Sequence, residues 1–273
     1  MPELPEVRCI AEMLNQKIKD IKILKVIFFE CSKVINDGHL YSSDFSIQND
    51  EDEYYVNINQ VCKAVTYYGK KICFLFDTFA IISALAMEGR WSFIDRGNTS
   101  IKICCENEVN LYFNDIECQG NFSIVNYESQ SYCHIFKDVG YDYDDERLTL
   151  DVFKSMIIQK KLQKKYLYDF LLDQKYFSGI GNYLRSEIIY ESKLKYDIQL
   201  GELSENDISK LYYAIKTILD ESYKCGGLTL SSYYKPDGSI GTYQPKIYMK
   251  KYTPCGAKVN VTLVTGKRKI YHI

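Results

Sequence analysis

The chain contains the stretch Gly179-Ile180-Gly181-Asn182-Tyr183-Leu184-Arg185-Ser186-Glu187. Two glycines separated by one residue predict a tight turn, and Asn182 directly after them is a common residue at the start of a helix. The Asn182 amide and the nearby backbone N–H groups would then hold phosphate at the positive end of that helix. The alternative is a plain tight turn that Asn182 caps, which explains the glycines but not the residues around them.

Helical periodicity surrounds this turn from about Leu150 onward. Apolar residues recur there at helical spacing, and the same pattern predicts a helix on each side of Gly179-Ile180-Gly181. Ser204 with Asp207 is close to a capping box and predicts the start of a further helix, which Gly226-Gly227 can stop. This part of the chain is therefore predicted to be mainly helical.

The amino terminus reads Met1-Pro2-Glu3-Leu4-Pro5-Glu6-Val7. Removal of Met1 would leave a secondary amine beside a carboxylate, and an α-amino group has a pKa of roughly 7.7–8.0. A neutral secondary amine can attack an electrophilic sugar carbon. Alternatively, Pro5 is only the first residue of a helix, and Glu3 and Glu6 interact with the positive end of its dipole.

Stretches rich in β-branched and aromatic residues follow the amino-terminal helix and predict strands. They are residues 21–29, 56–65, 71–79, 100–104 and 109–113. After Tyr243, residues 246–251, 259–264 and 269–273 are predicted to form a β-hairpin. We therefore expect an α+β protein with a β-sandwich catalytic domain (1–140), a linker (141–149), a helical domain (150–241) and a hairpin (242–273).

Composition places few limits on function. The 273 residues carry a formal charge of only −2, but no acidic residue follows Asp237, so the tail is locally basic. The ten cysteines are scattered, with no leader sequence or long apolar run, which predicts reduced thiols, an intracellular location and no membrane association. Abundant Ile, Lys, Tyr and Asn are typical of an AT-rich genome, such as that of a giant virus.

Three segments carry a family resemblance. Residues 170–174 with 179–187 resemble the helix-two-turns-helix signature of the formamidopyrimidine-DNA glycosylase and endonuclease VIII family. The amino-terminal heptapeptide resembles the same family, and residues 226–230 with 236–244 are similar to the segment that leads into its carboxy-terminal finger. The three segments stand in the family's order over nearly the whole chain.

The resemblance implies a set of site residues. Pro2 would be the nucleophile, and Glu3 would protonate the ribose ring oxygen. Glu6 and Glu187 would support catalysis. A family lysine in a hairpin matches Lys70, with Lys71 as the neighbouring alternative. The residues expected to contact DNA are Asn182, Arg268, Met87, Gly179 and Gly181.

The finger departs from the family's four-cysteine zinc site. Cys255 matches the first ligand, but no Cys or His lies within four residues after it, and Ile273 stands where a later cysteine is expected. Cys255 and His272 alone cannot make a tetrahedral zinc site. We therefore predict a zincless finger and no metal or other cofactor. Arg268 still stands two residues after Gly266, as the family's finger arginine does.

The residues that fill the space left by a flipped nucleotide also depart from the family. Met87 matches a family methionine, but residues 114–120 bring Glu117, Cys118 and Gln119 in place of an arginine and an aromatic residue. Extrusion from a duplex should then receive less compensation. This predicts that single-stranded DNA is tolerated or preferred.

The sequence thus predicts a monomeric DNA glycosylase and AP lyase that acts on damaged DNA, single-stranded or duplex. The absence of the family's arginine and aromatic residue from residues 114–120 favours oxidised pyrimidines and hydantoins as substrates. Residues 231–242, in contrast, resemble the family's loop over an oxidised purine. A catalytically silent DNA-binding protein is the alternative from another class. A metal-dependent nuclease has little support, because no Asp/His cluster has ligand spacing.

Overall fold

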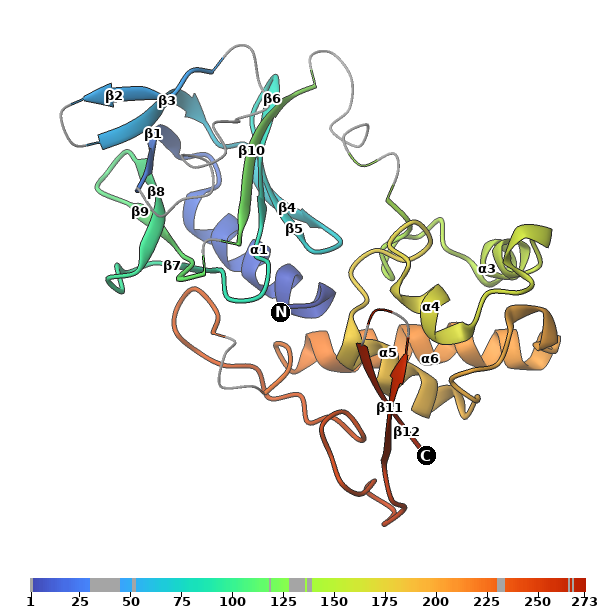
Figure 1. Cartoon of the computed structure of the whole chain (residues 1–273). Helices are drawn as coiled ribbons and strands as arrows, with labels where there is room; N and C mark the ends of the chain where they lie inside the picture. Colours follow the sequence, from blue (N-terminus) through green and yellow to red (C-terminus); the bar gives the residue numbers. More distant parts are fainter. Residues whose placement is uncertain are drawn as a thin grey trace. The chain divides into compact units, whose positions relative to one another are not determined.

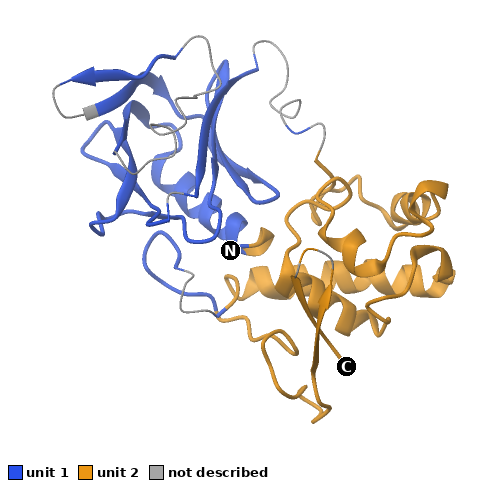
Figure 2. Cartoon of the chain, viewed as in Figure 1, with its two compact units in different colours: residues 1–2, 6–137, 229–241 blue, residues 3–5, 138–228, 242–273 orange. Residues whose placement is uncertain are grey.

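The computed structural model describes residues 2–29, 45–50, 53–117, 119–127, 136, 139–229, 234–264, 266 and 268–273. Cys118, one of the residues named for the second wedge loop, lies outside this set. The chain forms two compact units (Figure 2). Unit 1 comprises residues 1–2, 6–137 and 229–241, and unit 2 comprises residues 3–5, 138–228 and 242–273.

Unit 1 is a β-sandwich with helix α1 (Leu4–Ile18) contributing its residues 6–18 (Figure 1). One antiparallel sheet has the order β2-β3-β1-β8-β9-β7, and the other has the order β10-β6-β5-β4. The strands are β1 (Lys22–Phe28), β2 (Gln48–Asp50), β3 (Glu53–Val61), β4 (Ala64–Tyr68), β5 (Lys71–Leu75), β6 (Phe79–Ala84), β7 (Arg90–Ser92), β8 (Thr99–Cys105), β9 (Asn110–Asn114) and β10 (Asn121–Asn126).

A single buried cluster joins the two sheets and α1. Val26 and Ile103 come from the first sheet, Phe74 and Ile81 from the second, and Leu14 from the helix. All five residues are fully buried, so apolar burial is the main stabilising contribution in this unit. The predicted β-sandwich is therefore confirmed.

Two predicted strands are wrong as single strands. Residues 56–65 divide into β3 and β4, because the Cys62 N–H bonds to the Ile21 carbonyl beside one sheet while the Lys63 N–H bonds to the Leu75 carbonyl of the other. Residues 71–79 divide into β5 and β6 at a turn that the Phe76 N–H closes on the Phe79 carbonyl. Apolar composition continues through both turns and hides them.

Unit 2 is helical and ends in a hairpin. Its helices are α3 (Leu150–Ile157), α4 (Leu167–Leu172), α5 (Asn182–Ser192) and α6 (Glu205–Lys224), with 3-10 turns η2 (Lys160–Leu162) and η3 (Leu200–Glu202). The predicted capping box is present at Ser204 and Asp207, and α6 ends two residues before Gly226. Strands β11 (Asn260–Val264) and β12 (Arg268–His272) pair, and β12 lies against α5 (Figure 1).

Residues 246–251 do not form the predicted strand. The buried Glu187 carboxylate accepts hydrogen bonds from the N–H groups of Lys246, Ile247 and Tyr248 at 2.7, 2.9 and 2.8 Å. Three successive N–H groups that converge on one carboxylate cannot alternate as they do in a strand. A long-range contact therefore overrides the local β propensity of this segment.

Residues 229–241 group with unit 1, although they were predicted to belong to the helical domain. The Phe93 N–H bonds to the Pro236 carbonyl at 3.1 Å, and the Arg90 guanidinium lies over the Tyr234 ring at 5.5 Å. These contacts attach the described part of the segment to the residues around β7.

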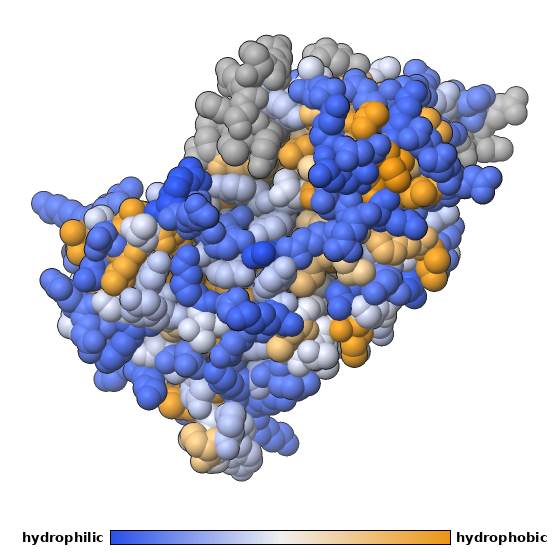
Figure 3. Space-filling model, turned by 180° about the vertical axis from the view of Figure 1, so that it is seen from behind, coloured by the Kyte–Doolittle hydropathy of each residue, from blue (hydrophilic) through white to orange (hydrophobic). Residues whose placement is uncertain are grey.

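One face of the molecule is largely hydrophilic, with apolar residues in small separate groups (Figure 3). Among the helices of the described residues, none has the length and apolar character needed to cross a membrane.

Candidate active site

The Glu3 carboxylate lies at the amino-terminal end of α5. Its oxygens accept hydrogen bonds from the N–H groups of Gly181, Tyr183 and Leu184 at 2.6, 3.0 and 3.2 Å. Glu3 is only 4% exposed. These N–H groups lack intrahelical partners, so the carboxylate satisfies them and benefits from the helix dipole. Glu3 and Gly181 are 178 residues apart in the chain. Their hydrogen bond therefore brings the amino-terminal motif and the glycine turn into one site.

The two glycines of the turn make this approach possible. A Cβ on Gly181 would lie 2.3 Å from a Glu3 oxygen, and a Cβ on Gly179 would lie 2.4 Å from the Leu4 Cβ. Gly179 also has a φ of +86°, which disfavours other residues. The Leu4 N–H bonds to the Gly179 carbonyl at 3.1 Å. Both glycines were predicted to contact DNA, and their observed neighbours are the residues next to Pro2.

Asn182 and Arg268 lie on the two elements that flank this site in unit 2. Asn182 is the first residue of α5 and is half-buried, and Arg268 is the first residue of β12 and is exposed. Arg185, one turn further along α5, donates to the Asn182 side-chain oxygen at 3.4 Å and to the Lys269 carbonyl at 2.8 Å. Arg185 stands within the glycine-turn motif, but no role was predicted for it. Its position directly after the apolar Leu184, inside the motif, was the available signal.

Glu187 is fully buried in α5 and holds the segment before the finger. Besides the three N–H groups of residues 246–248, the Tyr243 hydroxyl lies 3.4 Å from its carboxylate. Burial and the Glu187 charge hold the pKa of Tyr243 far above its ordinary value, so the hydroxyl stays protonated as a donor. The carboxylate that was expected to support catalysis is thus engaged with backbone donors.

The remaining predicted catalytic residues lie in unit 1. Pro2 is partly buried, and Glu6 is 1% exposed in the first turn of α1. Because Tyr68 pairs with Lys71, Gly69 and Lys70 form the turn of the β4–β5 hairpin. Lys70 is half-buried, whereas Lys71, the alternative, is exposed at the first position of β5.

Two loops of unit 1 carry exposed apolar side chains. Met87, between β6 and β7, is 53% exposed, and Ile116, between β9 and β10, is 63% exposed. A Cβ on Gly89 or Gly120 would meet the Phe113 ring at 2.5 or 2.6 Å, so both loops flank that ring. The sequence pointed to Met87 but not to Ile116, which stands beside Glu117 and is exposed in its loop.

The finger residues with possible metal ligands lie in different surroundings. Cys255 is exposed, and its pKa is lowered by the Thr253 hydroxyl, whose oxygen lies 3.1 Å from the sulfur. His272 Nε2 lies 2.9 Å from the Thr262 hydroxyl, and its ring packs against Tyr196 in a tilted arrangement, with centroids 4.4 Å apart and an interplanar angle of 34°. Among the residues that the structure describes, no group of three or more His, Cys, Asp or Glu side chains could hold a metal.

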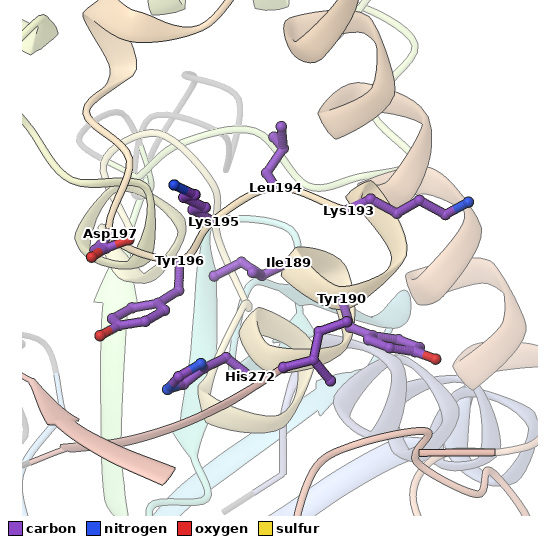
Figure 4. Close-up of a pocket in the computed structure, with 9 residues that line it drawn as sticks. Ile189, Tyr190, Lys193, Leu194, Lys195, Tyr196, Asp197 and His272 are labelled. Atoms are coloured by element: carbon purple, nitrogen blue, oxygen red, sulfur yellow. The ribbon is translucent and has the colours of Figure 1, made fainter. Parts of the chain in front are cut away.

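A cavity of about 390 Å³ lies at the carboxy-terminal end of α5. Figure 4 shows Lys193, Tyr196 and His272 around it. The lining of the cavity begins at Ile189, so about 10 Å of helix separates the cavity from the end of α5 that holds the Glu3 carboxylate. The cavity is therefore separate from the Glu3 site.

Two family models match this chain. The formamidopyrimidine-DNA glycosylase N-terminal domain matches residues 1–122, and the formamidopyrimidine-DNA glycosylase H2TH domain matches residues 139–233. Together they cover well over half of the chain. Their junction falls near the change from unit 1 to unit 2.

Curated relatives and solved structures agree with these matches. The chain is 28% identical to a formamidopyrimidine-DNA glycosylase of Listeria innocua, over 93% of this chain and 91% of that protein, and 26% identical to that of Oceanobacillus iheyensis, over 98% and 94%. The fold is similar to the MutM (Fpg) protein of Thermus thermophilus, with a TM-score of 0.81, 22% identity and coverage of 100% and 97%. It is also similar to Lactococcus lactis Fpg bound to DNA containing an AP site, with a TM-score of 0.78, 20% identity and coverage of 98% and 97%. The chain therefore belongs to the formamidopyrimidine-DNA glycosylase family of base excision repair and is a DNA glycosylase with AP lyase activity.

Proposed function

We propose that this glycosylase excises oxidised bases through a Schiff base on Pro2, after Met1 has been removed. The proposal is supported above all by Glu3, the next residue in the chain, whose carboxylate is held at the amino-terminal end of α5 by three backbone N–H groups. A secondary amine next to a fixed carboxylate combines a nucleophile with a proton carrier. Proline also restricts the direction of the amine, because its ring limits rotation.

The reaction proceeds through two successive exchanges of bonds at C1′ of the sugar, substitution of the base by the amine and then opening of the ring. The amine attacks C1′, and the base leaves with the electron pair of its bond to C1′ and takes a proton from water. The amine N–H proton passes to Glu3 and then to the ribose ring oxygen, as the bond between that oxygen and C1′ breaks. The product is an iminium ion on the opened sugar, from which β-elimination and then δ-elimination release phosphate.

The surroundings of Glu3 fit a role as a proton relay. Hydrogen-bond donation by three N–H groups favours the ionised carboxylate. Glu3 is then ready to receive the amine proton rather than holding one in advance. Glu6 and Lys70 complete the proposed catalytic set, in which the lysine can stabilise negative charge on the departing group. Glu187 supports it by fixing the residues before the finger.

We assign phosphate binding to Asn182 and Arg268. An amide at a helix start and an exposed guanidinium on a hairpin are groups that position a nucleic-acid backbone without reading sequence. Lactococcus lactis Fpg, which is similar in fold, has been solved with DNA containing an abasic site and with DNA containing Fapy-dG. We propose damaged DNA as the partner of this chain. Because residues 114–120 lack the family's arginine and aromatic residue, we propose oxidised pyrimidines and hydantoins as its main substrates.

The experiment that tests the proposal is covalent trapping by borohydride. Protein without Met1 is mixed with DNA that carries an abasic site, and only a Schiff base becomes a stable cross-link on reduction. We expect trapping by the wild type, feeble trapping by Pro2→Gly, which offers a primary amine, and normal trapping by the surface control Glu12→Gln. No wild-type cross-link under conditions where DNA is bound would favour the silent DNA-binding alternative.

A further inference from the structure

Arg185 is the most deeply buried cation that the structure describes. Its side chain is 0% exposed although it lies on α5 one turn after Asn182. One nitrogen, Nη2, donates to the Lys269 carbonyl at 2.8 Å and to the Asn182 oxygen at 3.4 Å. Within the described residues, Nε and Nη1 have no hydrogen-bond partner. A buried cation with two unbonded donors costs free energy, so its presence requires an explanation.

The contacts of Arg185 join the two elements that carry the proposed phosphate-binding residues. Asn182 begins α5, and Lys269 directly follows Arg268 in β12. A second bond, from the Tyr271 N–H to the Ser186 hydroxyl at 3.4 Å, runs between the same elements. Ile270 is buried beside these contacts. The β12 strand is therefore attached to the first turns of α5 by side chains of α5.

The charge of Arg185 also acts on this region. Burial above all lowers the pKa of its guanidinium to about 10, with an opposing contribution from Glu3 and a further lowering by the nearby Arg268 included in that value. Arg185 is therefore a cation at neutral pH, near enough to Arg268 for the two charges to interact.

We propose that Arg185 is a positioning residue that sets the distance between Asn182 and Arg268, so that both reach one DNA backbone. It contacts the Asn182 amide and the backbone next to Arg268, and it touches neither DNA nor the reacting atoms. This orients the finger arginine through a side chain of the helical domain. The inference rests on the proposed function, because it requires that Asn182 and Arg268 bind phosphate.

The test compares Arg185→Met, Arg268→Ala and the double variant in binding to a duplex that contains a tetrahydrofuran abasic-site analogue. Arg185→Met has a similar length and no charge, and Arg147→Met is the matched control, because Arg147 is an exposed arginine of unit 2. Dissociation constants are measured at several salt concentrations, and thermal unfolding is measured without DNA.

We expect Arg185→Met and Arg268→Ala each to weaken binding about tenfold and to lower the salt slope by about one unit. Because Arg185 acts through Arg268, the double variant should bind no worse than Arg268→Ala alone. Arg147→Met should bind within about threefold of the wild type. The unfolding midpoint of Arg185→Met should not fall, since replacement of a buried charge by an apolar group is often neutral or stabilising.

The inference is wrong if Arg185→Met binds with the affinity and salt slope of the wild type. It is also wrong if the two substitutions together weaken binding about a hundredfold, the product of their separate tenfold losses. If Arg185→Met does not fold, Arg185→Lys decides the question. Lysine can still bond to the Lys269 carbonyl, so binding within about threefold of the wild type supports positioning, and loss equal to that of Arg268→Ala contradicts it. Failure of the wild type to bind this DNA would instead overturn the proposed function.

Discussion

At the scale of single residues, Glu3 has both a structural and a proposed chemical role. Its carboxylate satisfies three N–H groups of α5 and also carries the proton in the proposed reaction. An amide in its place can still accept these bonds through its oxygen, but it cannot shuttle a proton. Glu3→Gln therefore separates the role of Glu3 in holding the α5 terminus from its proposed role in proton transfer.

We expect Glu3→Gln to bind abasic-site DNA within about threefold of the wild type and to lose base excision by at least about a hundredfold, the usual range for general acid–base catalysis. Single-turnover excision and a binding titration on the same preparation measure the two effects. Glu12→Gln, which loses a partly exposed i,i+4 ion pair on α1, is the control and should keep full activity. Full excision by Glu3→Gln would refute the proton-carrying role.

Gly181 is the second residue whose substitution tests the site, because an added Cβ would displace the Glu3 carboxylate. Its φ of −127° is available to any residue, so the predicted cost of Gly181→Ala is steric: the new Cβ would lie 2.3 Å from a Glu3 oxygen. We expect a decrease in excision of at least about tenfold with the helix intact by circular dichroism, since even small misplacement of a reacting group is costly. Normal excision by Gly181→Ala would show that the position of Glu3 is not critical.

At the scale of elements, Glu187 determines the path of residues 246–248 on the way to the finger. Its removal would leave three backbone N–H groups and the Tyr243 hydroxyl without their acceptor. Lys246 also pairs with Glu191 at 2.8 Å, at a partly exposed position. The two glutamates therefore offer a buried and a partly exposed carboxylate on one helix.

We expect Glu187→Ala to lower the free energy of unfolding by at least about 2 kcal/mol, because buried donors lose their partner. Glu191→Ala, the matched control, should cost less than about 1 kcal/mol. Urea titrations measure both. Wild-type stability in Glu187→Ala, combined with lost excision, would assign Glu187 to catalysis rather than to the support of this segment.

The finger is the other element with a testable property. β11 and β12 pair through five residues, and Ile270 is buried, so strand pairing and packing support this hairpin. We expect no stoichiometric zinc in the purified protein, because Cys255 and His272 supply too few ligands. Metal analysis by mass spectrometry and activity after chelation provide the measurement. One zinc per chain with chelator-sensitive folding would contradict this prediction.

At the scale of the whole molecule, the balance between duplex and single-stranded DNA depends on the two loops beside Phe113. Met87 and Ile116 offer exposed apolar side chains, which can fill space but cannot donate hydrogen bonds to an orphaned base. Extrusion from a duplex costs a few kcal/mol, and a single strand avoids most of that cost.

We expect excision of one oxidised pyrimidine from single-stranded DNA to be at least as fast as from duplex, measured under single turnover at matched salt. Replacement of Gln119 by Arg should raise the duplex rate, because the longer guanidinium brings more donors and a positive charge to the orphaned base. Glu117→Gln is the control, since it removes a charge without adding a longer donor. A duplex rate about tenfold faster in the wild type would mean that other side chains supply this compensation.

Periodicity and short motifs predicted that most helices of unit 2 and most strands of unit 1 exist, but not where each one begins and ends. The capping box at Ser204 and the helix after Gly181 appear where the residues indicate, because caps and glycine turns depend on neighbours within a few positions. The turn at residues 62–63 was missed because it is set by bonds to Ile21 and Leu75, which lie elsewhere in the sequence. The turn at residues 76–78 is closed locally, from Phe76 to Phe79, but the apolar composition that continues through it hid it.

The sequence by itself determined the family, the order of the elements and the residues expected to act, because motif spacing and apolar periodicity are local properties. Only the tertiary structure decided which groups surround them. Glu3 meets α5, Glu187 collects the backbone of residues 246–248, and Arg185 reaches the Lys269 carbonyl across separations of 178, 59 to 61 and 84 residues. Hydrogen bonds between distant residues leave no periodic trace in the chain, so the partners of a buried charge become visible only when the elements pack.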